Sequence, residues 1–307
     1  MKAVYASTVN HADPLAALAV GEQPEPQARP FWSTVSVRAV TVNHHDVWSL
    51  QGVGLAAEQT PMILGTDAVG ILDEDIPGKH GLKAGSEVVL YTFVGTDGAG
   101  VAPGERRTIL SEKYPGTMAE KTSVPSANVF AKPASLTTAE AAALGTSWLT
   151  AYSLLFDAAG IKPGDSVLIQ GAGGGVSTAA IQLAHAAGLE VFVTSRDADK
   201  RSKALKLGAN AALEIGARLP RKVDAVIESV GAATWSHSMK SVRPGGTIAI
   251  CGATTGNQPG AGLHHGFARG FRTIAALRGA RQSASGDRLR GQRAGRRARG
   301  LRQDDCR

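Results

Sequence analysis

The chain has few cysteines and few aromatic residues, and it has no long apolar run. Only Cys251 and Cys306 occur among its 307 residues, which excludes a disulfide framework and a cysteine-rich zinc site. No run approaches the roughly 18 apolar residues of a membrane helix, and the N-terminal MKAVYASTVN lacks the apolar segment of a secretory signal. Hydrophobic residues make up 43% and charged residues 19%, a globular mix. We therefore expect a soluble, cytoplasmic protein of about two domains.

The positive net charge of +7 is confined to the C-terminal end of the chain. Residues 1–263 hold 21 Lys and Arg against 23 Asp and Glu, whereas residues 264–307 hold 12 Arg, no Lys and three Asp. The body is thus slightly acidic, and we expect neither nucleic acid nor a membrane as its partner.

Residues 263–307 form an atypical tail rich in Arg, Gly and Ala, with no sustained helical or strand period after Leu277. We favour a shifted reading frame in a GC-rich gene as its origin, and the alternative is a disordered arm that binds nucleic acid. We expect about 281–307 to be poorly ordered and easily cut by trypsin. The preceding strand would then be an exposed sheet edge.

The first 130 residues favour β-structure. Residues 34–39 alternate apolar and polar side chains with the period of a half-buried strand. Residues 87–93 are a second candidate strand, and Gly and Pro separate such segments.

Residues 131–262 change to alternating strands and helices. The expected strands are 166–170, 190–195, 223–228 and 246–251. The expected helices begin at the capping box Thr137–Glu140, at Val176 and after Asp197. Strands separated by helix-length spacers predict an α/β fold with a doubly wound parallel sheet.

A glycine-rich turn joins the strand at 166–170 to the following helix. It contains Gly171, Ala172, Gly173, Gly174, Gly175 and Val176. Glycine permits a sharp turn and a close approach of the backbone to a ligand, and the helix N-terminus directs free N–H groups at an anion. This context predicts a dinucleotide-binding turn.

The end of the next strand indicates the choice of cofactor. Ser195 and Arg196 stand where NAD-binding proteins carry an acid, and Lys200 follows on the next helix. Hydroxyl and guanidinium groups suit a 2′-phosphate, which favours NADPH. Asp197 and Asp199 argue for NADH, but helix capping also explains them.

The chain resembles the medium-chain dehydrogenase/reductases, on the zinc-free quinone-oxidoreductase side. The motifs that carry the resemblance are residues 41–48, 61–70, 116–120, 149–152, 171–176 and 244–256. The resemblance implies a GroES-like β domain over 1–130 and a Rossmann domain over 131–262, with a sheet incomplete at its C-terminal end. Ser177 is a departure, since glycine is more usual there.

The resemblance also bears on metal binding. Zinc-binding members carry Cys, His and often Glu where this chain has Asn43, Thr66 and Asp67, with Thr146 near the last position. Asn and Thr are poor zinc ligands, so we expect no metal site. His44 and His45 would face opposite ways on a strand, and a structural or substrate-facing role is expected for them.

Without zinc, the resemblance implies hydride transfer from NADPH to a quinone or an activated C=C bond. It places Asn43 and Thr150 beside the nicotinamide, Gly252 and Thr254 in the cofactor site, and Asp46 and Trp48 nearby. Helix capping for Asp46 and core packing for Trp48 are the alternatives. We expect a small-molecule electron acceptor as substrate, and a homodimer is one possible assembly. The alternative function is a catalytically impaired, dinucleotide-binding pseudoenzyme.

Overall fold

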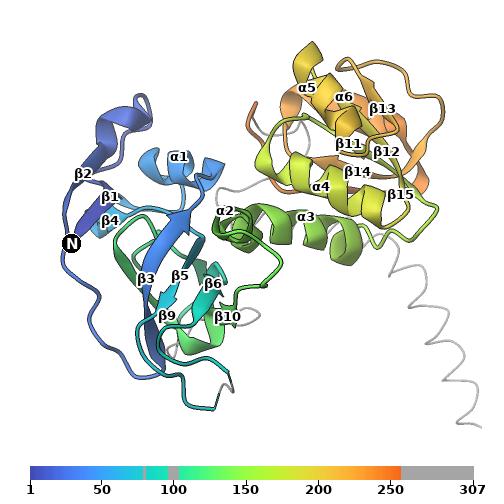
Figure 1. Cartoon of the computed structure of the whole chain (residues 1–307). Coiled ribbons are helices and arrows are strands. Elements are labelled where there is room, and N and C mark those ends of the chain that lie inside the picture. The colour runs from blue at the N-terminus through green and yellow to red at the C-terminus, as the bar shows by residue number, and fades with distance from the viewer. Residues whose placement is uncertain (79–80, 96–103, 257–307) are drawn as a thin grey trace, which may run out of the picture.

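The computed structural model describes residues 1–78, 81–95 and 104–256 (Figure 1). The expectations for the tail 263–307 concern residues outside these ranges. The strand Val242–Ile250, which we expected to form an edge, is described, and it is the end strand of its sheet among the described residues. No helix among the described residues is long and apolar enough to span a membrane.

The N-terminal part is built from antiparallel strands. A five-stranded sheet has the order β10-β6-β5-β3-β9, a three-stranded sheet the order β2-β1-β4, and β7 pairs with β8. The strands are β1 (Lys2–Ala6), β2 (Leu18–Glu22), β3 (Trp32–Val40), β4 (Met62–Ile63), β5 (Ala68–Leu72), β6 (Glu87–Leu90), β7 (Phe93–Val94), β8 (Thr108–Ile109), β9 (Lys121–Pro125) and β10 (Val129–Ala131). The helices are η1 (Pro14–Ala17), α1 (His44–Leu50), η2 (Ala57–Gln59) and η3 (Ser126–Asn128).

The C-terminal part is a parallel sheet with the strand order β13-β12-β11-β14-β15. This is the strand order of a Rossmann sheet. Its strands are added outward in one direction from the first strand and then in the other direction from the fourth, so the order reverses between β11 and β14. The strands are β11 (Ser166–Ile169), β12 (Glu190–Thr194), β13 (Ala211–Leu213), β14 (Val223–Glu228) and β15 (Val242–Ile250). The connecting helices are α4 (Gly175–Ala186), α5 (Ala198–Lys206) and α6 (Ala232–Ser241).

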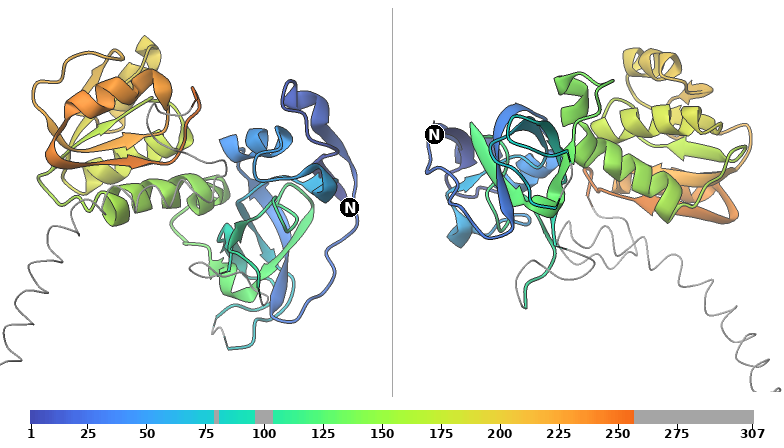
Figure 2. Two further views of the ribbon diagram at one scale, coloured as in Figure 1. Left: turned by 180° about the vertical axis from the view of Figure 1, so that it is seen from behind. Right: turned by 60° about the horizontal axis from the view of Figure 1, so that its bottom comes forward.

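One interrupted helical segment connects the two parts (Figure 2). It consists of α2 (Thr138–Ala142), the π-helical turn η4 (Leu144–Trp148), α3 (Leu149–Tyr152) and the π-helical turn η5 (Ser153–Ala158). The predicted capping box begins it: the Thr137 hydroxyl accepts from the Glu140 amide, and the Glu140 carboxylate accepts from the Thr137 amide. The segment contacts both parts: η4 lies beside β6 and α4, α3 packs against α4, and η5 packs against β15.

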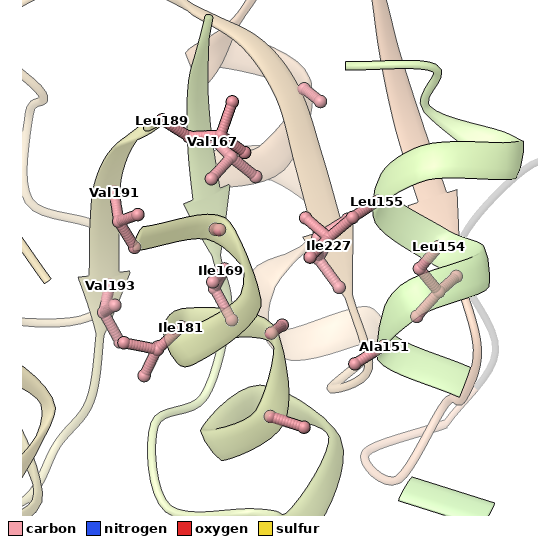
Figure 3. Packing of buried hydrophobic residues seen from close by; sticks show 14 of the residues in the cluster. Ala151, Leu154, Leu155, Val167, Ile169, Ile181, Leu189, Val191, Val193 and Ile227 are labelled. Carbon is pink, nitrogen blue, oxygen red and sulfur yellow. The ribbon is translucent and has the colours of Figure 1, made fainter. Parts of the chain in front are cut away.

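The core of the Rossmann part holds this segment in place (Figure 3). Ile169 and Ile227 of adjacent strands, Ile181 of α4, and Leu154 and Leu155 of η5 are all at most 1% exposed. Burial of each such side chain contributes roughly 1.5–3 kcal/mol. The connecting segment is therefore fixed to the sheet by apolar packing as well as by the chain.

Two local predictions are corrected by the structure. His44 and His45 lie in the helix α1, not on a strand, because the Asp46 carboxylate accepts from the Asn43 amide and so stabilises a helix start there. The segment 87–93 is not one strand: β6 ends at Leu90, and the chain turns before β7.

Candidate functional site

A cavity of about 300 Å³ lies between the two parts of the molecule. One wall is the beginning of α1 in the β-rich part, with His44 and Trp48. The opposite wall is the carboxyl edge of the parallel sheet: the turn after β11, Ser229 and Val230 after β14, and Gly252 and Thr254 after β15. This is the edge, at the reversal of strand order, where open α/β sheets bind ligands. Most of the predicted cofactor and catalytic positions meet here.

The predicted dinucleotide turn has the backbone that its glycines permit. Gly171 and Gly173 have φ values of +77° and +100°, which residues other than glycine rarely adopt. At Gly175 the reason is space, since a Cβ would lie 2.6 Å from the Ser147 hydroxyl oxygen. Gly174, at the N-cap of α4, provides no side-chain cap. The N–H groups of the first helical turn are therefore oriented to receive an anion.

The residues predicted to bind the 2′-phosphate of NADPH follow the end of β12, and they do not line the cavity. Arg196 is exposed, and it forms no ion pair within the described part of the chain. The aliphatic chain of Lys200 lies against Gly173, so close that a Cβ there would be 2.7 Å from the Lys200 Cδ. Ser195 is buried, and its hydroxyl accepts from the Asp197 amide. Lys200 thus stands beside the turn and links it to α5, while Arg196 is an exposed cation after β12.

The acidic alternative at this position has a structural explanation. Asp197 caps α5, accepting from the amides of Asp199 and Lys200 at 2.8 and 3.1 Å. These bonds lower the pKa of the Asp197 carboxyl, the Lys200 amide having the largest effect. Arg201 is held by the Ser195 carbonyl oxygen and by Glu214. The cap that sequence analysis proposed for Asp197 is confirmed, and Arg201 is engaged in structure rather than free for a phosphate.

The four residues at zinc-ligand positions form a hydrogen-bonded cluster. Asn43 Nδ2 donates to Asp67 Oδ1 at 3.0 Å and to Thr66 Oγ1 at 3.2 Å. Thr66 Oγ1 lies 2.8 Å from Thr146 Oγ1, and the Thr146 amide donates to Asp67 Oδ2 at 3.1 Å. A zinc ligand must present a lone pair, but the Asn43 amide group directs N–H bonds at its neighbours. This donor set does not fit zinc.

Asp67 is a fully buried carboxyl group behind the cavity. Burial raises its pKa to about 6, against the opposing effect of hydrogen bonds from Thr41, Thr146 and Asn43. The cluster thus contains one carboxyl group that accepts hydrogen bonds from its neighbours and has a pKa of about 6. Asn43 is oriented by that group, and its own Oδ1 accepts from the Ser147 hydroxyl at 3.2 Å.

Asp46 has the structural role that sequence analysis gave as the alternative. Only 4% of it is exposed, and it does not line the cavity. Its two oxygens accept from the amides of Asn43 at 2.7 Å and Gly65 at 3.0 Å. Burial is the main cause of its raised pKa. We therefore remove Asp46 from the candidate catalytic residues, because both oxygens are engaged in shaping α1.

Trp48 and His44 form the aromatic side of the cavity. Their rings meet edge to face, with centroids 4.9 Å apart and planes at 81°. A Cβ at Gly252 would lie 3.7 Å from the Trp48 ring, which therefore reaches across to the Rossmann part. Partial burial lowers the pKa of His44. Thr150 lines the same cavity, and its hydroxyl has no hydrogen-bond partner among the described residues. These groups offer a flat apolar surface and a free hydroxyl.

Ser147, Ser229 and Val230 also line the cavity, although none of them was predicted from the sequence. No motif marks Ser147, which reaches the cavity only because the π-helical turn η4 positions it there. Ser229 and Val230 had a usable signal, since they follow a predicted parallel strand next to the glycine turn. Cys251 also lines the cavity, and burial raises the pKa of its thiol to about 12, so it is not a thiolate nucleophile.

Two family models match the chain. The model for the alcohol dehydrogenase GroES-like domain covers residues 29–134, and the model for zinc-binding dehydrogenases covers residues 175–285. An NAD-dependent alcohol dehydrogenase of known structure is 31% identical, with a TM-score of 0.75 over 92% of this chain and 90% of that one. The chain belongs to the medium-chain dehydrogenase/reductase superfamily. The predicted combination of a GroES-like domain and a Rossmann sheet is confirmed.

Relatives within this superfamily carry several activities in their names. The quinone oxidoreductase of Escherichia coli, solved with NADPH, is 25% identical, with a TM-score of 0.70 over 86% of this chain and 76% of that one. The crotonyl-CoA reductase of Streptomyces avermitilis is 28% identical over an alignment covering 80% of this chain and 66% of that protein. The chain thus spans just under two thirds of the length of that relative.

Proposed function

We propose that the protein is an NADPH-dependent oxidoreductase that delivers hydride, without zinc, to a quinone or an activated C=C bond. The observation that carries the proposal is the cavity itself. A dinucleotide turn lies on one side, an aromatic wall on the other, and the adjoining zinc-ligand positions hold a hydrogen-bonded cluster that does not fit the metal.

The cofactor fits the turn in shape and charge. The positive φ values at Gly171 and Gly173 and the uncapped start of α4 suit a pyrophosphate. Arg196 and the adjacent Lys200 provide cations for a 2′-phosphate. Similarity to the E. coli quinone oxidoreductase solved with NADPH supports this choice, whereas the NAD-dependent relative makes NADH the alternative to test.

The residues of the chain have separable tasks in this reaction. NADPH, when bound, supplies the hydride. The Trp48 ring provides a flat surface for a planar acceptor. The Thr150 hydroxyl, which has no partner among the described residues, can donate a hydrogen bond to an acceptor oxygen as negative charge develops on it. Asn43, fixed by four neighbours, keeps the rear of the cavity polar and rigid.

The chemistry of the side chains at the cavity favours reduction of an acceptor over oxidation of an alcohol. Ionising an alcohol at neutral pH calls for a strong electrophile beside its oxygen. The groups at the zinc-ligand positions are amide and hydroxyl, which polarise an oxygen only by hydrogen bonding. An acceptor that already has an electron-poor carbon needs only alignment and a hydrogen-bond donor.

The test combines binding with turnover. NADPH binding is measured by the change in its fluorescence, and oxidation by the loss of absorbance with a panel of quinones, enones and enoyl thioesters. Saturable binding and turnover of at least one acceptor, unaffected by a chelator, are expected. Binding without turnover of any acceptor would identify a dinucleotide-binding pseudoenzyme and reject the proposal.

A further inference from the structure

Ser177, the residue that departs from the usual glycine, is tied into the dinucleotide turn by its hydroxyl group. Its Oγ donates to the Gly171 carbonyl oxygen at 2.8 Å, and it accepts from the Gly174 amide at 3.1 Å. The Gly174 carbonyl oxygen lies at 3.1 Å from the same hydroxyl. Only 3% of Ser177 is exposed. One side chain therefore links the first glycine of the turn to the N-cap of α4.

This arrangement compensates for a glycine at the N-cap. A side chain at that position normally accepts from the third amide of the helix, while the third side chain accepts from the N-cap amide. Gly174 cannot form the first bond, but Ser177 forms the second. The turn gains a cross-link that glycine at 177 could not make, and Ala172 and Gly173 lie inside the linked loop.

The cross-link also decides which backbone donors remain for a ligand. The Gly174 N–H is already bonded to Ser177, so it is not available to an anion. The amides at the start of α4, Gly175 and Val176, lack acceptors within the helix by virtue of their position. Their direction depends on how firmly the preceding turn is held.

We propose that Ser177 is a positioning residue for the cofactor: its hydroxyl fixes the glycine turn so that the first amides of α4 face the pyrophosphate. This rests on the proposed dinucleotide function and identifies the residue that sets its affinity. The cross-link acts before the ligand arrives, so it lowers the entropy lost when the turn is ordered around a pyrophosphate.

The test is Ser177→Ala, compared with Thr178→Ala as the matched control. Thr178 is the next residue of the same helix, and no hydrogen bond of its hydroxyl occurs within the described structure. Isothermal titration uses two probes: NADP⁺, which contains the pyrophosphate, and adenosine 2′-monophosphate, which lacks it. We expect Ser177→Ala to raise the Kd of NADP⁺ roughly three- to tenfold. The Kd of adenosine 2′-monophosphate should not change, and Thr178→Ala should leave the Kd values of both probes at their wild-type levels.

An equal rise in the Kd of both probes would show a general loss of structure and overturn the proposal. Unchanged NADP⁺ binding by Ser177→Ala would also overturn the proposal. Tighter binding would overturn it as well, because it would show that the freed Gly174 amide is a better donor to the pyrophosphate than the cross-linked turn. Failure of the wild-type protein to bind NADP⁺ would instead reject the proposed function.

A second measurement does not depend on any ligand or on the stability of the variant. In the wild-type protein without cofactor, the Gly174 amide should exchange its hydrogen for deuterium more slowly than the Gly173 amide, because only the former is bonded to Ser177. Equal exchange rates at the two glycines would overturn the cross-link.

Discussion

The hydroxyl group of Ser147 donates to Oδ1 of Asn43 at 3.2 Å, and it occupies the space that a Cβ at Gly175 would need. Asn43 begins α1 in the β-rich part, and Gly175 begins α4 in the Rossmann part. A single side chain on the connecting segment thus touches the polar cluster and the dinucleotide turn. This contact connects the beginning of α1 with the beginning of α4.

Gly175→Ala should weaken both folding and cofactor binding. The added Cβ would meet Ser147 Oγ at 2.6 Å, and overpacking of this kind typically costs about 1–3 kcal/mol. Urea unfolding and NADPH titration measure the two effects. In a Ser147→Ala background the closest atom is removed, so much of the loss should be recovered. Strictly additive effects of the two substitutions would contradict the steric explanation.

Asp67 should make the protein less stable as the pH rises from about 4 to 6. Its folded pKa of about 6 exceeds the ordinary value of 3.8, so the folded state binds more protons than the unfolded state between these limits. Asp67→Asn removes this titration. The substitution should therefore cost more stability at pH 4.5 than at pH 7, by on the order of 2 kcal/mol.

Urea unfolding at the two pH values measures this difference, and Asp157→Asn, at an exposed position, is the control for loss of a charge. A cost of Asp67→Asn that is the same at both pH values, or larger at pH 7, would show that the carboxyl is ionised without penalty in the folded protein.

The purified protein should retain no zinc after dialysis, as measured by elemental analysis. The amide and hydroxyl groups at positions 43, 66 and 146 satisfy one another and are poor ligands. The triple variant Asn43→Cys, Thr66→His and Thr146→Cys is the matched comparison, because it places thiolate and imidazole ligands where these side chains already converge. One zinc per chain in the unmodified protein would contradict the prediction.

NADPH should bind about tenfold or more tightly than NADH. A hydrogen bond to a charged group contributes roughly 1.5–3 kcal/mol, and we propose that the exposed Arg196 and Lys200 make such bonds to a 2′-phosphate. Arg196→Ala should reduce the preference while leaving NADH affinity unchanged. Lys200→Ala should weaken both cofactors, because its side chain also packs on Gly173. Equal affinities in the unmodified protein would refute the prediction.

Much of this fold could be predicted from local sequence, because the signals are themselves local. The Thr137–Glu140 capping box, the Asp197 cap and the apolar strands of the parallel sheet depend on neighbouring residues and on burial of both sheet faces. The glycine turn belongs to this group, since φ values above zero at Gly171 and Gly173 need glycine whatever surrounds them.

The roles of individual polar side chains were decided only by the tertiary structure. The sequence Asn43-His44-His45-Asp46 is equally compatible with ligands, bases or caps. Asp46 is buried against the Gly65 amide, and Asp67 is buried against Asn43. Both carboxyl groups therefore have structural roles, because a buried carboxyl group needs hydrogen-bond donors from the surrounding fold. Ser147 reached the site through the π-helical turn η4, which the periodicity of the sequence does not predict. The sequence determined which elements form and where a dinucleotide can bind, and long-range packing determined which side chains remain free to act on it.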